Sequence, residues 1–265
     1  LNKTSDFREE YLKIYPTSNV LVISDKEAEA AKRSRMLAQI ASNDWDAVII
    51  GYSTFGLIPV SAETQREYIQ NQINEIERVI KEMTTTDKRN TVSFVKQLEK
   101  TKKSLEAKLS ALLKKPKDTT MSFEELGIDA LFVDEAHNYK NLSYYTKLNV
   151  AGAKGSESAR AEDLYMKSEY IRDKNGVVVL ATATPITNTV SEMYNMLRYV
   201  GPYTLETSGT KAFDAWASAF GKVETVVEMA PDGVTPRVKE RFSKFRNVTA
   251  MVSMFRQYAD IKKTS

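Results

Sequence analysis

Four short apolar runs constrain the fold more than any other feature of the sequence. They lie at residues 20–23, 47–50, 130–133 and 177–181, and they are near-continuous and rich in β-branched residues. Such runs are typical of parallel strands that are covered on both faces. Helical patterns separate them, so the order of elements predicts an α/β fold with a parallel sheet flanked by helices. In such sheets, functional residues gather at the carboxyl ends of the strands.

Residues 62–117, between the second and third runs, carry a different pattern. Apolar residues step by three and four from Ile69 to Met83, and again from Val95 to Leu112 after a polar turn. This spacing predicts two antiparallel helices, each about 30 Å long, that form a hairpin projecting from the sheet domain as an arm. Two roles stay open. The hairpin is a structural or protein-docking insertion, or its excess of lysine between residues 96 and 117 touches DNA.

Residues 204–265 are polar, and their pattern indicates helices at 210–220 and 237–261. Pro231, Asp232 and Gly233 mark a loop between them. We therefore expect a helical C-terminal extension.

Composition excludes several classes of protein. Cysteine is absent and histidine occurs once among the 265 residues, which excludes disulfides and argues against a structural zinc site. A net charge of +3 is too small to indicate polyanion binding by itself. No apolar run approaches the roughly 20 residues that span a bilayer, and the first residues lack the apolar core of a signal peptide. We expect a cytoplasmic protein that does not contact membranes.

An acidic pair, Asp134 and Glu135, directly follows the third apolar run. In phosphoryl-transfer ATPases an acid at the end of a hydrophobic strand helps to hold Mg²⁺, and a neighbouring carboxylate can polarise the attacking water. Asp134 would then be the metal ligand, and Asp134 with Glu135 would face the bound ATP. Acids also end hydrophobic strands for solubility alone, so the pair by itself decides little.

The residues after the acidic pair carry a resemblance. Residues 134–141, Asp-Glu-Ala-His-Asn-Tyr-Lys-Asn, resemble the second motif of superfamily 2 helicases of the DEAH type, specifically the Swi/Snf-like branch, and residues 123–129 resemble that family's approach to the motif. Lys140 and Asn141 match the Lys-Asn pair of the motif. The resemblance implies the RecA-like first lobe of a helicase or translocase that hydrolyses ATP with Mg²⁺ and moves on duplex DNA.

A second stretch is similar to the third motif of the same family. Residues 180–188, Leu-Ala-Thr-Ala-Thr-Pro-Ile-Thr-Asn, meet its pattern except that Ala183 replaces a glycine. Two hydroxyls on a tight turn can hydrogen-bond the acidic motif and relay its state. By resemblance Glu135 activates water, while His137, Thr182 and Thr184 couple hydrolysis to lobe movement. The alternative is a plain threonine-rich turn before a helix.

Residues 46–55 are similar to the family's strand and turn that face the nucleic-acid backbone. Tyr52, Ser53 and Thr54 offer hydroxyls that could bind phosphates without reading the base sequence. With Lys140, Asn141 and Asn188 from the two motifs, they form the expected nucleic-acid contact set. A purely structural turn is an equal alternative for residues 52–54.

A motor of this kind needs a Gly-x-x-x-x-Gly-Lys-Ser/Thr loop for the phosphates, and no stretch of the sequence fits that pattern. We expect the loop upstream of Leu1 and a second lobe with arginine fingers downstream of Ser265.

The predicted organisation is then lobe 1 at residues 1–61 and 118–203, lacking its phosphate loop, with the hairpin insertion at 62–117 and the helical extension at 204–265. The isolated chain is expected to be inactive. The alternative is a non-catalytic scaffold, or a partner-docking module, of a restriction/modification or mobile-element complex, with a protein partner at the hairpin.

Overall fold

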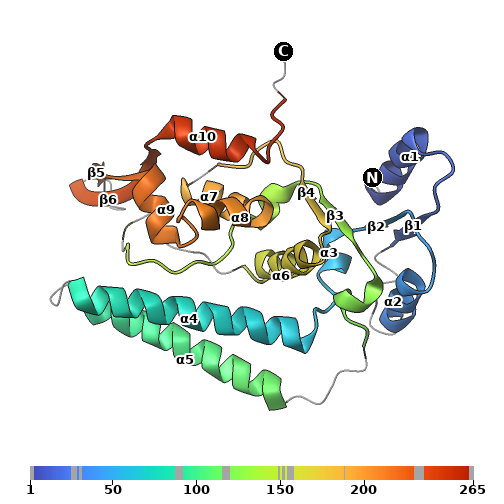
Figure 1. Ribbon diagram of the computed structural model, residues 1–265, viewed down its shortest axis with the longest axis horizontal. Helices are drawn as coiled ribbons and strands as arrows, with labels where there is room; N and C mark the ends of the chain where they lie inside the picture. Colours follow the sequence, from blue (N-terminus) through green and yellow to red (C-terminus); the bar gives the residue numbers. More distant parts are fainter. Residues whose placement is uncertain are drawn as a thin grey trace.

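The computed structural model describes residues 3–24, 29, 32–86, 92–114, 120–148, 150, 153, 158–187, 189–229 and 236–262 (Figure 1). Helices and short parallel strands alternate through most of the chain, which is a mixed α/β arrangement. The elements are α1 (Lys3–Ile14), β1 (Val20–Ile23), α2 (Arg33–Ala41), β2 (Ala47–Ile50), α3 (Tyr52–Phe55), α4 (Ala62–Thr86), α5 (Val92–Lys114), η1 (Phe123–Leu126), β3 (Ala130–Val133), η2 (Ala136–Tyr139), α6 (Ala159–Asp173), β4 (Val177–Leu180), α7 (Ser191–Val200), α8 (Pro202–Thr207), α9 (Phe213–Phe220), β5 (Gly221–Met229), β6 (Pro236–Phe245) and α10 (Val248–Arg256).

The four predicted strands are present and pair in parallel. β1 pairs with β2, and β3 pairs with β4 in a register that places Val133 opposite Leu180. No hydrogen-bonded ladder joins the two pairs within the described residues, so the single sheet predicted from the four runs is observed as two two-stranded sheets. Both pairs nevertheless contribute to one hydrophobic core, in which Leu21, Ile23 and Val133 are buried with residues of α2 and α6.

A second core lies beside the first and is mostly aromatic. Its buried residues include Tyr144, Tyr194, Phe213 and Trp216, which contact one another through stacked and edge-on rings. Helix α7 belongs to both cores and is buried on nearly all sides, with Tyr199 in the first core and Tyr194 in the second. The two cores therefore share one helical wall.

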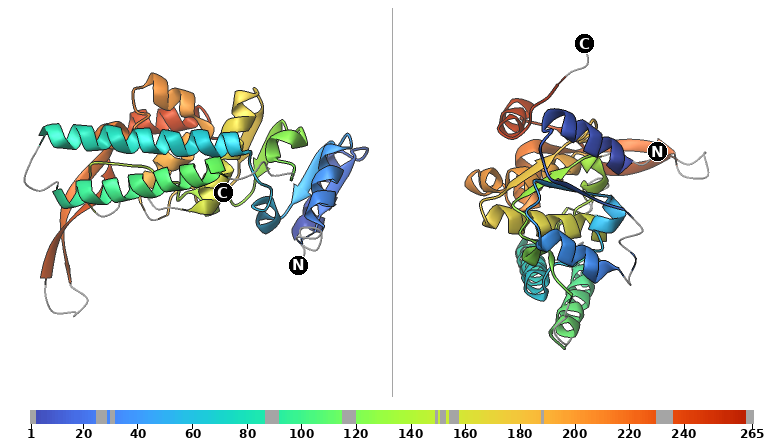
Figure 2. Two further views of the ribbon diagram at one scale, coloured as in Figure 1. Left: turned by 90° about the horizontal axis from the view of Figure 1, so that it is seen from below. Right: turned by 90° about the vertical axis from the view of Figure 1, so that its right-hand side faces the viewer.

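Helices α4 and α5 are present where the periodicity places them and run antiparallel (Figure 2). Their shared seam buries Ile76, Val79 and Leu98. The pair extends away from the sheets, but α4 lies against the rest of the molecule: Gln72 Nε2 donates to Ser143 Oγ at 3.1 Å, and Lys147 Nζ lies 3.8 Å from Glu82 Oε2. The hairpin is therefore docked along its inner helix and is not a free arm. The turn predicted within 84–90 lies largely outside the described residues.

The prediction of a helical C-terminal extension is wrong in two places: the helix predicted at 237–261 is a strand as far as Phe245, and residues 221–229 form a strand that was not predicted. The extension does contain the helices α8, α9 and α10. Between α9 and α10, however, β5 and β6 form an antiparallel ribbon. The run of Val and Thr from Val223 to Val227 favours strand, because β-branched side chains are stiff at χ1 and fit a pleated surface. Buried Phe242 packs on Gly221, where a Cβ would lie 1.9 Å from its ring. The loop predicted at residues 231–233 falls outside the described residues.

Among the described helices, none combines the length and the apolar character that crossing a membrane requires.

Candidate functional site

The turns that follow β3 and β4 meet at one edge of their two-stranded sheet. The parallel register brings the two carboxyl ends together, and the backbone ladder continues past both strands. Ala181 N donates to Val133 O at 2.8 Å, and Ala136 N donates to Ala181 O at 2.9 Å. The acidic motif and the threonine-rich motif, 45 residues apart at His137 and Thr182, are therefore neighbours.

Glu135 has an unusual backbone conformation. Its φ of 45° and ψ of 43° lie in the left-handed region, which L residues other than Asn and Gly rarely adopt. The conformation is held by the following turn, because Asn138 Nδ2 and Asn138 N both donate to Glu135 O, at 2.9 and 3.0 Å. Strain of this kind concentrates at functional sites, where the surrounding structure enforces it. The carboxylate of this strained residue lies against His137.

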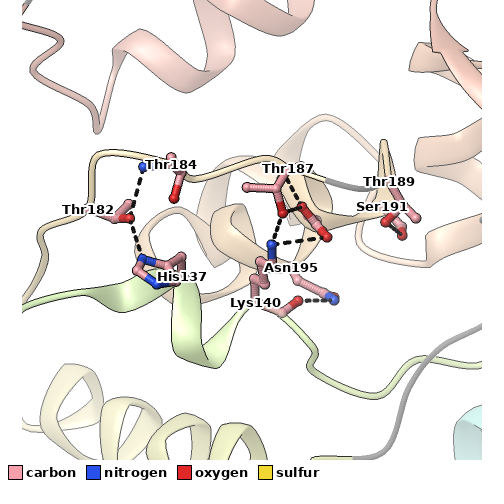
Figure 3. A network of polar contacts seen from close by, with 9 residues as sticks. His137, Lys140, Thr182, Thr184, Thr187, Thr189, Ser191 and Asn195 are labelled. Atoms are coloured by element: carbon pink, nitrogen blue, oxygen red, sulfur yellow. Dashed lines mark hydrogen bonds and ion pairs between the residues drawn. The ribbon is translucent and has the colours of Figure 1, made fainter.

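His137 joins the two turns through one nitrogen atom. Its Nδ1 lies 3.2 Å from Glu135 Oε2. The same atom lies 3.2 Å from Thr182 Oγ1 (Figure 3). Thr182 Oγ1 also accepts from Thr184 N at 3.1 Å. The imidazole therefore contacts the carboxylate of one motif and the hydroxyl of the other. This is the contact that the two motifs were expected to make.

Asp134 projects from the end of β3 with an exposed side chain. Its carboxylate accepts no hydrogen bond from the described part of the chain. No cluster of three or more acidic, His or Cys residues capable of holding a metal occurs among the described residues. A single carboxylate still suits Mg²⁺, which usually takes one or two carboxylates and completes its octahedron with water and substrate phosphates.

Tyr52 contacts the acidic turn, and its side chain is also 38% exposed to solvent. Its hydroxyl donates to Asp134 O at 2.6 Å, and its ring meets Tyr139 edge-on at 6.1 Å. Partial burial, and after it the charges of Asp134 and Glu135, raises the pKa of Tyr52, so the hydroxyl stays protonated and remains a donor. Helix α3 is thereby fastened to the end of β3.

The expected nucleic-acid contact set is only partly placed at the surface. Thr54 is 1% exposed, so its hydroxyl cannot reach a backbone phosphate in this structure. Thr54 follows Tyr52 on a short helix whose inner side packs into the first core, which the local sequence does not reveal. Ser53 and Asn141 are exposed, and Asn188 lies outside the described residues.

Lys140 is also buried, with 8% exposure, so it is not placed to contact nucleic acid. Its Nζ lies 3.3 Å from Glu192 Oε1 and donates to Thr187 Oγ1. Glu192 in turn accepts from Thr187 N at 2.6 Å. The pair Lys140–Glu192 therefore ties the end of the acidic motif to the end of the threonine-rich motif, at the start of α7.

Helix α7 supplies positioning residues that the motifs did not indicate. Asn195 Nδ2 donates to Lys140 O at 2.8 Å and to Leu142 O at 3.0 Å, and Tyr199 Oη donates to Tyr139 O at 3.1 Å. With Glu192, these polar residues recur at steps of three and four on a helix that is otherwise apolar on its inner side. That spacing marks one face of α7 and is the sequence signal that could have identified them.

Comparison with known protein families gives one result for the whole chain. A family model described as a probable helicase domain matches residues 2–263. The chain belongs to this family of probable helicase domains. The match covers the hairpin α4–α5 and the β5–β6 ribbon as well as the strands, so the helicase-domain family includes these parts.

One curated relative is similar over most of the domain. The helicase domain is 28% identical over 251 residues to the defense against restriction protein B of Escherichia phage P1, a match that covers 88% of this chain and 10% of the relative. The chain thus spans about a tenth of that relative's length. No solved structure matches the chain.

Proposed function

We propose that the chain is part of the first, RecA-like lobe of a Swi/Snf-like motor of superfamily 2, which couples ATP hydrolysis to movement along duplex DNA. The observation that carries the proposal is the contact of His137 Nδ1 with both Glu135 and Thr182. Membership of the helicase-domain family supports the same class of activity. Such a motor needs a contact between the residue that takes part in hydrolysis and the segment that moves. The contact of His137 with a carboxylate and a hydroxyl on neighbouring turns can provide it.

The residues of the site suit ATP with Mg²⁺. Bound Mg²⁺ would neutralise charge that develops on the terminal phosphates. Asp134, exposed and free of protein hydrogen bonds in the described chain, is the residue that would hold it. Glu135 would orient the attacking water and accept its proton, and its contact with His137 Nδ1 at 3.2 Å holds the carboxylate in place.

His137 and Thr182 would transmit the effect of ATP hydrolysis from Glu135 to the loop after β4. If the Glu135 carboxylate gained a proton from the water, it would lose its negative charge and attract His137 Nδ1 less strongly. The contact of His137 Nδ1 with Thr182 Oγ1 would then become the stronger of the two. Thr182 Oγ1 holds Thr184 N, and the same loop continues to Thr187 and the buried Lys140–Glu192 pair. Movement of this loop would reach α7, which both hydrophobic cores hold.

The chain would share the lobe with other parts of a longer protein. On the face of the β3–β4 pair that bears Phe132, Val177 and Val179, these side chains are 73%, 54% and 40% exposed. Parallel strands are normally covered on both faces. We propose that further elements of the lobe, including a phosphate loop that the 265 residues lack, cover this face. The matched relative, of which the chain spans about a tenth, has room for them.

A second candidate is a non-catalytic scaffold within a complex that counters restriction. The name of the phage P1 relative and the lack of a phosphate loop in these residues favour it. The strained Glu135 and its contact with His137 count against it, because a scaffold has no use for a strained carboxylate.

The test is DNA-stimulated ATP turnover by the longer protein that carries this domain, compared with its Glu135→Gln variant. Glu206→Gln is the matched control, since Glu206 is an exposed glutamate paired only with Lys211 among described residues. We expect Glu135→Gln to abolish DNA-stimulated turnover and Glu206→Gln to leave it unchanged. Equal turnover in the wild-type protein and the Glu135→Gln variant would overturn the motor proposal, and no turnover in any of the three would favour the scaffold. Residues 1–265 alone should not hydrolyse ATP.

A further inference from the structure

The outer helix of the hairpin presents an unusual surface. Helix α5 packs only on α4 with more than marginal contact, and α4 separates it from the rest of the molecule (Figures 1 and 2). Its apolar side, including Leu98 and Leu105, faces α4. The opposite side carries the lysine face, which we define as Lys96, Lys100, Lys103 and Lys114, all of them exposed.

The four lysines lie on one line along the helix. At about 100° per residue their spacings bring them within about 60° of one another, and at 1.5 Å per residue they span about 27 Å. The positions between them on this face are small, Ala107 and Ser110. The lysine face is therefore a straight, one-signed row without large apolar side chains.

Charge is segregated between the two helices of the hairpin. Helix α5 contains six lysines and two glutamates, whereas α4 contains five glutamates against two arginines and one lysine. The glutamates of α5 lie to one side of the lysine face, and Glu106 Oε1 is 3.6 Å from Lys102 Nζ. The positive charge of α5 is thus directed outward.

Lys102 shows what a lysine with a structural role does on this helix. It lies at the seam, where its Nζ is 2.5 Å from Glu77 Oε1 of α4. None of the four residues of the lysine face forms an ion pair with a described residue. Structural pairing within the described hairpin therefore explains Lys102 and leaves the lysine face without a structural role.

We propose that the lysine face of α5 binds the phosphate backbone of duplex nucleic acid. A straight row of point charges suits a stiff duplex, whose phosphates repeat along its axis and whose bound counterions are released on contact. A protein partner fits this face less well, because protein interfaces are depleted in lysine and centre on buried apolar or aromatic residues. The binding needs neither ATP nor the turn after β3, so it goes beyond the proposed function.

The test is the binding of a fluorescently labelled 30-base-pair DNA duplex to the 265-residue chain without ATP, measured by anisotropy between about 50 and 200 mM salt. The variant changes Lys96, Lys100, Lys103 and Lys114 to Gln. The matched control changes Lys13, Lys32, Lys211 and Lys262 to Gln, four exposed lysines in surface ion pairs elsewhere. Both variants lose four positive charges, and circular dichroism with thermal unfolding verifies that both fold.

We expect the lysine-face variant to bind at least about tenfold more weakly than wild type and the control to bind within about threefold of it. The slope of log affinity against log salt should fall by roughly 3 to 4 in the variant, since each duplex phosphate contact contributes about 0.9. Equal binding by the two variants, or no binding by wild type, would overturn the proposal. Displacement of the labelled duplex at a lower charge concentration by poly-glutamate than by unlabelled duplex would also overturn it, in favour of an acidic protein partner. None of these three results bears on ATP turnover, which Glu135→Gln tests separately.

Discussion

The turn after β3 and the outer helix α5 are held in opposite ways. The turn is tied to α3 through Tyr52, to the loop after β4 through His137, and to α7 through Lys140 and Glu192. Helix α5 has one substantial partner, α4. A region held from three sides keeps reacting groups in fixed positions, whereas a region held along one seam can change its outer surface without disturbing the core.

This difference separates two kinds of functional residue. Around the turn, some polar side chains, such as Lys140 and Glu192, also connect two elements, so their loss should disturb both the site and the fold. On α5 the residues that hold the helix, such as Leu98 and Lys102, are distinct from those that face outward. Substitutions of the residues that connect the turn to α7 should therefore have large effects on stability, and substitutions on the outer side of α5 should have small ones.

The largest loss of unfolding free energy is expected for Glu192→Ala. The substitution leaves Lys140 buried without its carboxylate partner, and breaking one side of a buried pair costs about 3–5 kcal/mol of unfolding free energy. Urea unfolding measures it. The double variant Lys140→Met/Glu192→Leu removes both charges and should recover most of the loss. A loss below about 1 kcal/mol for Glu192→Ala would show that the pair does not join the two loops.

A smaller effect is expected for Tyr199→Phe. The single O–H of Tyr199 is shared between two buried carbonyl oxygens, Ala161 O at 2.8 Å and Tyr139 O at 3.1 Å. Loss of the donor should lower the unfolding free energy by about 1–3 kcal/mol. Tyr203→Phe is the control, because Tyr203 is 74% exposed and its change should stay within about 0.5 kcal/mol. Equal effects of the two substitutions would contradict the role of α7.

Glu135→Gly should stabilise the fold. Glycine adopts the left-handed conformation without a Cβ penalty, so relief of strain at φ 45° should raise the unfolding free energy by about 1 kcal/mol. Glu135→Gln keeps the strain and should leave stability nearly unchanged. A glycine variant that is less stable than the glutamine variant would mean that the Glu135 backbone is not strained.

The smallest effect on stability is expected on the hairpin. Replacing Lys96, Lys100, Lys103 and Lys114 with Gln should leave the midpoint of urea unfolding unchanged, because none of them forms an ion pair with a described residue. A clear drop in the midpoint would show that these lysines support the hairpin and that the two regions differ less than their contacts indicate.

Much of the fold could be predicted because local pattern and tertiary role agree. Near-continuous runs such as Val177–Leu180 are strands, and the steps of three and four between Ile69 and Leu112 are the two helices of the hairpin. The meeting of His137 and Thr182 also follows, since both come after parallel strands whose ends lie together.

What could not be predicted depends on long-range packing. The burial of Thr54 and Lys140 follows from α7 and the first core, which local sequence does not contain. The sequence of β6 predicts helix because its charged residues, such as Arg241 and Lys244, resemble a solvated helical face. For β6, the cross-strand register and the contact of Phe242 with Gly221 distinguish strand from helix. The division into two strand pairs likewise has no signal in the apolar runs.

The most direct test of the central claim is DNA-stimulated ATP turnover by the Thr182→Val variant of the longer protein. Valine keeps the shape of threonine but removes the hydroxyl that contacts His137 Nδ1 and Thr184 N. We expect turnover to fall about tenfold, the equivalent of about one lost hydrogen bond, and Thr182→Ser to retain near wild-type turnover. Wild-type turnover by a folded Thr182→Val variant would contradict the claim that the two turns act as one unit.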